Sequence, residues 1–195
     1  MKILIATGNK GKLDQFKRIF DYLGSDIELL SLKDVGIFDD VSEDQETLLG
    51  NARKKAKFYA EKSGLPALSD DFGIFVDALG GFPGVHSKRW LEGSDEDRCH
   101  AIIEKLKDFS REEWTAKYIG AVVLYDPEKE EFWENEHILE GSVSGDFSDS
   151  GSFGYDPIFV PVGGDKCLAD VSDAERDFMI HRGVGIKTLL EYLND

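Results

Sequence analysis

Two adjacent carboxylates, Asp70 and Asp71, directly follow the short apolar segment Ala67–Ser69, which is predicted to be a strand. In α/β folds, ligands bind where strands end. Such carboxylates suit Mg²⁺, which takes few protein ligands and completes its shell with phosphate and water. A carboxylate beside such a metal can also orient or deprotonate an attacking water. The pair therefore predicts metal-assisted hydrolysis, and a solvated pair on a surface turn is the alternative.

Three further acids, Glu43, Asp44 and Glu46, precede a helix that is predicted from Thr47 to Lys62. Negative side chains at a helix N-terminus complement the helix dipole. Taken alone, this segment favours that electrostatic role over metal binding.

The first loop of the chain has the composition of an anion site. Thr7, Gly8, Asn9, Lys10, Gly11 and Lys12 lie between a predicted strand and a predicted helix. Backbone N–H groups at a helix start bind anions, the glycines allow close approach and the lysines add charge. The spacing is not that of a Walker A loop. Phosphate binding and a simple turn with solvated lysines are equally compatible with this segment.

The segment from Gly151 to Pro157 places Phe153, Tyr155 and Asp156 around Gly154. An aromatic ring in a glycine turn can stack on a nucleobase, and an aspartate can accept hydrogen bonds from ring N–H groups. A turn at the start of a strand, with a packed aromatic residue, is the alternative.

Basic residues gather near the C-terminus of a chain that is otherwise acidic. Arg176 lies on a short predicted helix that begins at Ser172, and His181-Arg182-Gly183 interrupts the helical pattern after it. Recognition of an anion or a base explains the cluster. Neutralisation of a helix C-terminus is the alternative.

The hydrophobic pattern defines the elements that must position these residues. Strands are expected at residues 2–6, 27–32, 67–69, 116–125, 131–140 and 156–161, with a possible extension at 142–147. Helices are expected from Leu13 to Gly24, at residues 47–62 and 95–107, and at residues 184–193. This order predicts an α/β protein with a mixed twisted sheet, helices on its faces and a hairpin lobe.

Composition restricts the possible classes of function. The chain has 195 residues, 41% of them hydrophobic, which suits a single globular domain over residues 1–195. A net charge of −16 argues against nucleic-acid binding. No apolar run approaches the length of a membrane span, and the N-terminus does not resemble a signal peptide. Cys99 and Cys167 are expected to be buried free thiols, so the predicted location is the cytoplasm.

Six motifs occur in order between Ile3 and Leu193. They are Thr7-Gly8-Asn9-x-x-Lys12, Glu43 with Thr47 and Asn51-Ala52-x-x-Lys55, Ser69-Asp70-Asp71-x-Gly73, Leu79-Gly80-Gly81-Phe82-Pro83-Gly84, Phe153-Gly154-Tyr155-Asp156-Pro157 and His181-Arg182-Gly183. In register, they resemble the inosine triphosphate pyrophosphatase family, whose bacterial members are known as dITP/XTP pyrophosphatases.

The resemblance implies hydrolysis of ITP, dITP or XTP to the monophosphate and pyrophosphate, with Mg²⁺ as cofactor. It also implies a homodimer, and an elongated mixed sheet in two lobes with a central cleft. The implied triphosphate contacts are Thr7, Gly8, Asn9, Lys10, Gly11, Lys12 and Lys55. Glu43 and Asp71 would bind the metal, Asp71 would be the general base and Asp70 would support them. The implied base contacts are Phe153, Gly154, Tyr155 and Asp156, with His181 and Arg182 at the 6-oxo group.

The chain departs from the family pattern at four positions. Phe72 replaces a usual serine, and Arg176 stands where lysine is usual. Glu46 and Ser152 replace common glycines. We expect Phe72 to line the substrate cleft, although alternation along a strand would point it away from Asp71. Arg176 keeps its charge with a changed geometry, and is expected to contact substrate.

Two alternatives differ from this interpretation. A pyrophosphatase for modified pyrimidine or methylated nucleotides would lack a purine-type His181-Arg182 pair. A non-catalytic nucleotide-binding protein would not need Glu43, Asp70 and Asp71 together.

Overall fold

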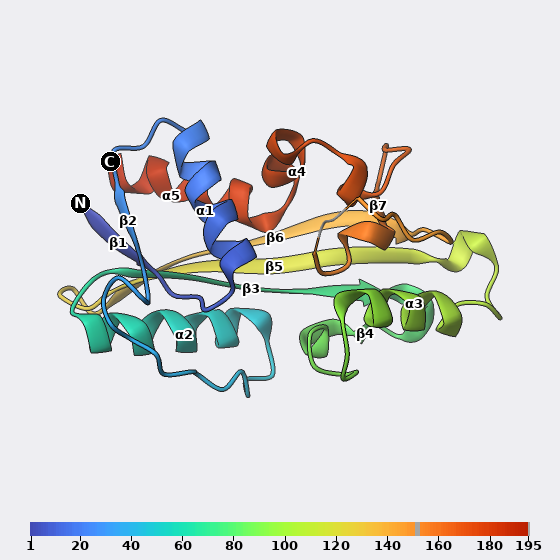
Figure 1. Ribbon diagram of the computed structural model, residues 1–195, viewed down its shortest axis with the longest axis horizontal. Coiled ribbons are helices and arrows are strands. Elements are labelled where there is room, and N and C mark those ends of the chain that lie inside the picture. The colour runs from blue at the N-terminus through green and yellow to red at the C-terminus, as the bar shows by residue number, and fades with distance from the viewer. Residues whose placement is uncertain (151–152, 195) are drawn as a thin grey trace. The chain divides into compact units, whose positions relative to one another are not determined.

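The computed structural model of the protein describes residues 1–150 and 153–194. Within them, the strands form one mixed sheet in the order β2-β1-β3-β5-β6-β7, and β4 pairs with β3 (Figure 1). The strands are β1 (Lys2–Ile5), β2 (Glu28–Ser31), β3 (Ala67–Val76), β4 (Phe82–Pro83), β5 (Thr115–Asp126), β6 (Glu131–Val143) and β7 (Phe159–Pro161). The helices are α1 (Lys10–Tyr22), α2 (Leu48–Ser63), α3 (Asp95–Lys105), α4 (Asp173–Met179) and α5 (His181–Asn194).

The sheet combines parallel and antiparallel pairs. β1 lies parallel to both β2 and β3, whereas β7 lies antiparallel to β6 and β4 antiparallel to β3. Parallel neighbours require helical crossovers, which α1 and α2 supply. The predicted α/β class with a mixed sheet and flanking helices is therefore confirmed.

The chain divides into two compact units. Unit 1 comprises Met1–Asp71, Gly120–His137 and His181–Asp195, and unit 2 comprises Phe72–Ile119 and Ile138–Ile180. Neither unit is a continuous segment, because β3, β5 and β6 each contribute residues to both. A single domain over residues 1–195 and a central cleft between two lobes remain predictions.

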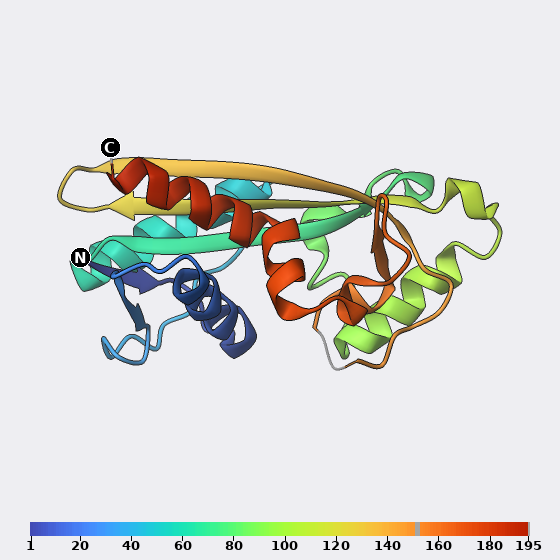
Figure 2. The same cartoon turned by 90° about the horizontal axis from the view of Figure 1, so that it is seen from above.

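Unit 1 has strands covered on both faces. α1 and α5 lie together on one face and α2 lies on the other (Figure 1). Figure 2 shows α5, in red, running along the strands with α1, in dark blue, beside it. The face covered by α2 has a core to which β1, α2 and β5 all contribute. Its fully buried residues include Leu4, Ala52, Ala56, Ala121 and Val123.

Unit 2 has a core of its own, formed where α3 packs against β3, β5 and β7. Its buried members include Ile74, Ile102, Tyr118, Phe159 and Leu168. Buried apolar surface stabilises each unit separately.

Helix starts follow their capping residues. Asn9 caps α1 by accepting from the Lys12 amide, and Thr47 caps α2 by accepting from the Gly50 amide. The prediction that α1 starts at Leu13 was therefore too late by one turn, because Asn9 captures the first N–H groups. The proposed strand extension at 142–147 ends at Val143. Among the described residues, no helix has both the length and the apolar character that crossing a membrane requires.

Candidate active site

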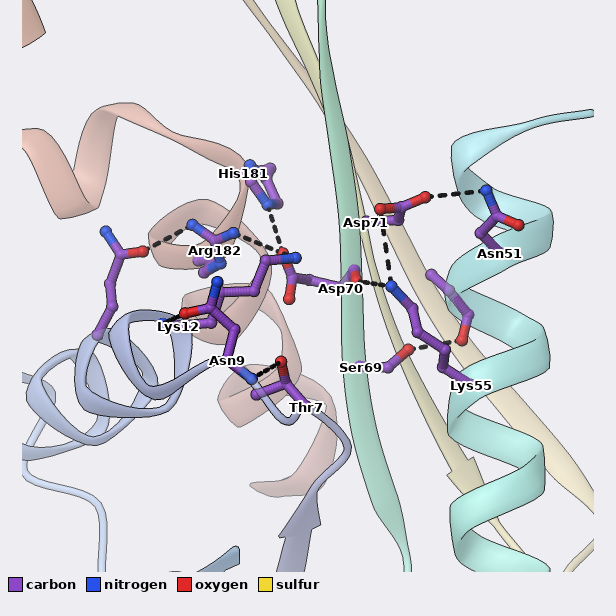
Figure 3. A network of polar contacts seen from close by, with 12 residues as sticks. Thr7, Asn9, Lys12, Asn51, Lys55, Ser69, Asp70, Asp71, His181 and Arg182 are labelled. Carbon is purple, nitrogen blue, oxygen red and sulfur yellow. Dashed lines mark hydrogen bonds and ion pairs between the residues drawn. The ribbon is translucent and has the colours of Figure 1, made fainter. Parts of the chain in front are cut away.

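The predicted phosphate loop forms the start of α1. The Thr7 hydroxyl accepts from the Asn9 amide at 3.2 Å, and the Asn9 side chain accepts from the Lys12 amide at 3.2 Å. Lys10 is exposed on the first turn of the helix, whereas Lys12 is directed toward β3 (Figure 3). Gly8 is exposed in the loop and Gly11 lies within α1. Amide groups at a helix start beside a lysine can bind an anion.

The sequence predicted that Asp70 and Asp71 follow the end of a strand. Instead they lie in the middle of β3, which continues to Val76. Strand geometry then directs adjacent side chains to opposite faces. Asp70 points toward α1 and α5, and Asp71 points toward α2 (Figure 3). The prediction ended this strand at Ser69, whereas it continues through the acidic pair and the buried Gly73 to Val76. The two carboxylates therefore have different partners.

Asp70 is the centre of a buried cluster of cations. Its Oδ2 atom lies 2.9 Å from Lys12 Nζ, 2.7 Å from Arg182 Nη2 and 3.2 Å from His181 Nε2. The side chains of Asp70 and Arg182 are each only 1% exposed. The Gln15 side-chain carbonyl accepts from Arg182 Nη1 at 2.6 Å. Gln15 was not predicted, although its position on the same helix, one turn after Gly11 and Lys12, could have indicated it.

The charges in this cluster support one another. Burial raises the pKa of Asp70, but Arg182 and Lys12 outweigh it and hold this pKa well below its ordinary value. Burial lowers the pKa of Lys12 to about 8, although Asp70 opposes the change. Burial, together with Arg182, lowers the pKa of His181 to about 4. His181 is therefore neutral near pH 7, and its Nε2 atom must carry the proton that Asp70 accepts.

His181 and Arg182 form the first turn of α5, whereas the sequence predicted a break before a helix at Val184. The break occurs one residue earlier, at Ile180, which is extended. Gly120 on β5 makes room for the imidazole, because a Cβ atom there would lie 2.3 Å from His181 Cγ. Gly120 was also missed, and a glycine inside an apolar strand was the available signal.

Asp71 faces α2 and a second cation. Its Oδ2 atom accepts from Asn51 Nδ2 at 3.0 Å, and its Oδ1 atom lies 3.6 Å from Lys55 Nζ. The same ammonium donates to Glu43 Oε1 and to the Asp70 backbone carbonyl, both at 2.7 Å. Burial raises the pKa of Asp71, although Lys55 opposes it. A raised carboxylate pKa is favourable for a general base.

Glu43 and Asp71 fit a divalent cation. Both carboxylates contact one ammonium, so they converge on a single position for positive charge. No larger cluster of histidine, cysteine and acidic side chains suited to a metal occurs in residues 1–150 and 153–194. Two carboxylates are nevertheless enough for Mg²⁺, which uses phosphate and water for its other positions. Asp44 instead pairs with Lys54 at the surface.

The predicted base pocket belongs to unit 2. Gly154 has a φ of +69°, a conformation that glycine adopts without strain. Its amide donates to Asp95 Oδ2 at 2.7 Å, and its carbonyl accepts from Cys99 Sγ at 3.3 Å. Two residues of α3 that the sequence did not identify therefore fix the turn beside the half-buried Phe153. Gly151 and Ser152 lie outside the described residues.

Two further predictions for this segment need correction. Asp156 begins a single 3-10 turn, η4 (Asp156–Ile158), and only Phe159–Pro161 is a strand. Pro157 lacks the N–H group that a continuing ladder would need. Tyr155 points into the core, where its hydroxyl donates to the Ser87 carbonyl at 2.6 Å, so its side chain has a structural role.

Arg176 does not join His181 and Arg182 in one cluster. Its Nε atom lies 3.7 Å from Asp156 Oδ2, and Nη2 donates to Asp173 at 2.5 Å, all within unit 2. The predicted set thus separates into Arg176 with the base-pocket carboxylate and Arg182 with Asp70. The sequence grouped these residues because they are close in the chain. In the structure, however, α4 ends and α5 begins between Arg176 and His181.

Phe72 is half-buried in unit 2. Its ring meets Tyr118 edge-on, with centroids 5.9 Å apart and planes at 60°. Phe72 Cζ lies 3.5 Å from the position of a Cβ atom on Gly154. The ring therefore borders the predicted base-pocket turn, and alternation along β3 indeed points it away from the face of Asp71.

A sheet that presents paired carboxylates beside buried cations is typical of enzymes that act on phosphate compounds. The chain matches the Ham1 family over residues 3–192 and belongs to it. It is 38% identical to a dITP/XTP pyrophosphatase from Symbiobacterium thermophilum, over 98% of this chain and 94% of that protein. The enzyme of the same name from Mycobacteroides abscessus is 37% identical, over 100% of this chain and 96% of that protein.

Solved structures agree with this assignment. A crystal structure of a nucleoside-triphosphatase, the dITP/XTP pyrophosphatase from Mycobacterium abscessus, superposes with a TM-score of 0.75 at 37% identity, covering 97% of this chain and 99% of that one. The structure of a HAM1 protein from Coxiella burnetii superposes with a TM-score of 0.86 at 27% identity, covering 100% and 98%. The resemblance found in the sequence is confirmed.

Proposed function

We propose that the protein hydrolyses non-standard purine nucleoside triphosphates, ITP, dITP and XTP, to the monophosphate and pyrophosphate. This activity would remove altered purines from the nucleotide pool. The relatives of nearly equal length carry the name of this activity. The observation that carries the proposal is the division of β3 into two charged faces, with Asp71 beside Glu43 and Lys55, and Asp70 beside Lys12 and Arg182.

The triphosphate is bound by the start of α1 and by two lysines. The amides after Asn9 and the ammonium of Lys12 supply donors and positive charge on one face of β3. Lys55 supplies a second ammonium on the other face. Asp70 compensates Lys12, and Asp71 and Glu43 compensate Lys55. Burial lowers the pKa of Lys55, but the charges of Asp71, Asp70 and Glu43 outweigh it and raise this pKa.

Asp71 is the general base in this proposal. It accepts a proton from a water molecule, whose oxygen forms a bond to the α-phosphorus. The bond from that phosphorus to the α,β-bridging oxygen breaks, and its electron pair leaves with pyrophosphate. Asn51 and Lys55 orient the Asp71 carboxylate. Glu43 and Asp71 would hold Mg²⁺, which when bound neutralises phosphate charge and stabilises the leaving group.

Base selection uses the turn of Phe153 to Asp156, in unit 2. A purine with a 6-oxo group carries a hydrogen on N1, which an aspartate such as Asp156 can accept. Within unit 1, His181 and Arg182 both contact Asp70, so their assignment to the 6-oxo group rests on the family resemblance. Adenine would leave such buried groups unpaired, which disfavours it.

The deciding experiment is a pyrophosphate-release assay with ITP, XTP, dITP, GTP and ATP. We expect the first three to be the preferred substrates and the products to be monophosphate and pyrophosphate in equal amounts. Release of orthophosphate, or a preference for modified pyrimidine nucleotides, would refute the proposal. Binding without turnover would support a non-catalytic protein instead.

Metal removal should abolish activity. EDTA is expected to stop pyrophosphate release, and excess Mg²⁺ should restore it, because the Glu43 and Asp71 oxygens are hard ligands. Isothermal titration of the ligand-free protein gives an independent measurement, in which Glu43→Gln should weaken Mg²⁺ binding. Full activity in excess EDTA would eliminate the two-carboxylate site.

Substrate capture should weaken in alkaline solution. The pKa of Lys12 is about 8 because burial disfavours its charged form, so the ammonium is present below that pH and lost above it. The value of kcat/KM reports groups of the free enzyme and should fall as pH rises through about 8. Lys12→Arg should remove this decline, because a guanidinium stays charged. Ionisation of the substrate base affects both proteins equally, so an identical decline in the variant would contradict the role of Lys12.

The assembly and location are also proposals. The family resemblance supports a homodimer, which light scattering would test by a mass of two chains. The two free thiols, Cys99 and Cys167, support a reducing compartment such as the cytoplasm. Fluorescent fusion imaging in the source cell would test this location.

A further inference from the structure

Tyr118 on β5 is a buried tyrosine to which the sequence assigned no role beyond a strand. It is 4% exposed, and its hydroxyl lies 3.3 Å from Oδ1 of Asp156, the carboxylate assigned to the base. Its ring stacks on Phe159 with centroids 4.1 Å apart and planes at 24°. The stack and the Phe72 edge contact fix the ring, so the hydroxyl reaches Asp156 from a defined direction.

Asp156 itself is 7% exposed, so its charge needs partners. On Oδ2 it has the Arg176 guanidinium, with Nε 3.7 Å away, and Arg176 is held in turn by Asp173. Burial raises the pKa of Tyr118 well above its ordinary value, and the Asp156 charge adds to this, so the phenol remains protonated. Tyr118 is therefore a donor and Asp156 the acceptor in their hydrogen bond.

The backbone that carries Asp156 is also held in place. Asp95 binds the Gly154 amide and Cys99 contacts the Gly154 carbonyl, which leaves the turn little freedom. Phe72 lies against the same glycine and against Tyr118. Every group in this arrangement belongs to unit 2. The Tyr118 hydroxyl on Oδ1 and the Arg176 guanidinium near Oδ2 then contact the carboxylate from this fixed backbone.

We propose that Tyr118 is a positioning residue for base selection, whose hydroxyl keeps the Asp156 carboxylate oriented as an acceptor for the N1–H group of a 6-oxopurine. The inference rests on the proposed function, in which Asp156 contacts the base. Hypoxanthine and guanine carry a hydrogen on N1, whereas adenine presents a lone pair there. A fixed, ionised acceptor therefore binds the first two and repels adenine.

Tyr118→Phe tests this inference because it removes the hydroxyl and retains the ring with its stack on Phe159. We expect the ratio of kcat/KM for ITP to that for ATP to fall about tenfold, the effect of losing roughly 1.4 kcal/mol of hydrogen bonding to a charged group. The loss should lie mainly in KM for ITP, and GTP should follow ITP because it shares the N1–H group. The melting temperature should change little.

Tyr125→Phe is the matched control, since Tyr125 lies on the same strand, is equally buried and belongs to unit 1. It should leave the ITP to ATP ratio unchanged. As a second measurement, Tyr118→Phe should lower this ratio no further in an Asp156→Asn background, because the hydroxyl would then have no carboxylate to orient.

The outcomes separate this inference from the proposed function. If the wild-type protein released no pyrophosphate from ITP, the proposed function would fail, and this inference with it. If the wild type is active and Tyr118→Phe keeps the wild-type ratio, only the role of Tyr118 is refuted. Equal losses for ITP and ATP with a lower melting temperature, or additive effects in the double variant, would also refute it, because they indicate a structural role.

Discussion

Asp71→Asn is expected to lower the turnover of ITP at least ~100-fold while the protein stays folded. The substitution keeps the shape of the side chain, and the asparagine carbonyl can still accept from Asn51, as Asp71 Oδ2 does at 3.0 Å. The substitution removes the negative charge of Asp71, which, like that of Glu43, lies beside the Lys55 ammonium. The variant therefore loses the proton acceptor and one of the two proposed metal ligands.

Three measurements make this prediction specific. Turnover is measured by pyrophosphate release, folding by circular dichroism and Mg²⁺ affinity by calorimetry. Asp34→Asn provides the control, because Asp34 is exposed and bonds only locally to Ser31 in the described contacts. It should keep the wild-type rate. Near-normal turnover by a folded Asp71→Asn protein would assign the base to another residue.

Asp70→Ala should have the largest effect on stability, lowering the free energy of unfolding by about 3–5 kcal/mol. Asp70 is fully enclosed and is the shared counter-ion of Lys12 and Arg182. Its removal leaves two buried cations without their nearest negative charge, and that penalty exceeds the loss of a surface ion pair. Urea denaturation of both proteins measures the difference.

The cause of this loss can be tested by relieving the uncompensated charge. In a Lys12→Met background, Asp70→Ala should lower the free energy of unfolding by less than it does in the wild type. One of the two cations that lose their counter-ion is then already absent. Lys12 is the suitable partner, since its pKa of about 8 already shows the strain of burial. Two results would show that water compensates Lys12 and Arg182 instead. One is a decrease of less than about 1 kcal/mol in the free energy of unfolding on Asp70→Ala, and the other is full additivity of Asp70→Ala and Lys12→Met.

The sequence determined the types of chemistry and most of the elements. The apolar strands and the Asp70-Asp71 pair are local features, because strand burial depends on near neighbours. Helix capping is local too, but the Asn9 cap was missed and the start of α1 was placed at Leu13. Six motifs in register were sufficient for the family, which the comparisons confirm. These properties depend on residue types and spacing, and both are visible in the sequence itself.

The tertiary structure decided which residues meet. The continuation of β3 past Gly73 directs Asp70 and Asp71 to opposite faces, and no local pattern predicted that continuation. The pairing of Arg176 with Asp156, and of Arg182 with Asp70, depends on where α4 ends and α5 begins.

The positioning residues were also missed. Gln15, Gly120 and Tyr118 contribute through partners 167, 61 and 38 positions away in the chain, namely Arg182, His181 and Asp156. A residue type shows what a side chain can donate or accept. Its partner is set by the packing of elements that are distant in sequence, and that packing is a property of the whole chain.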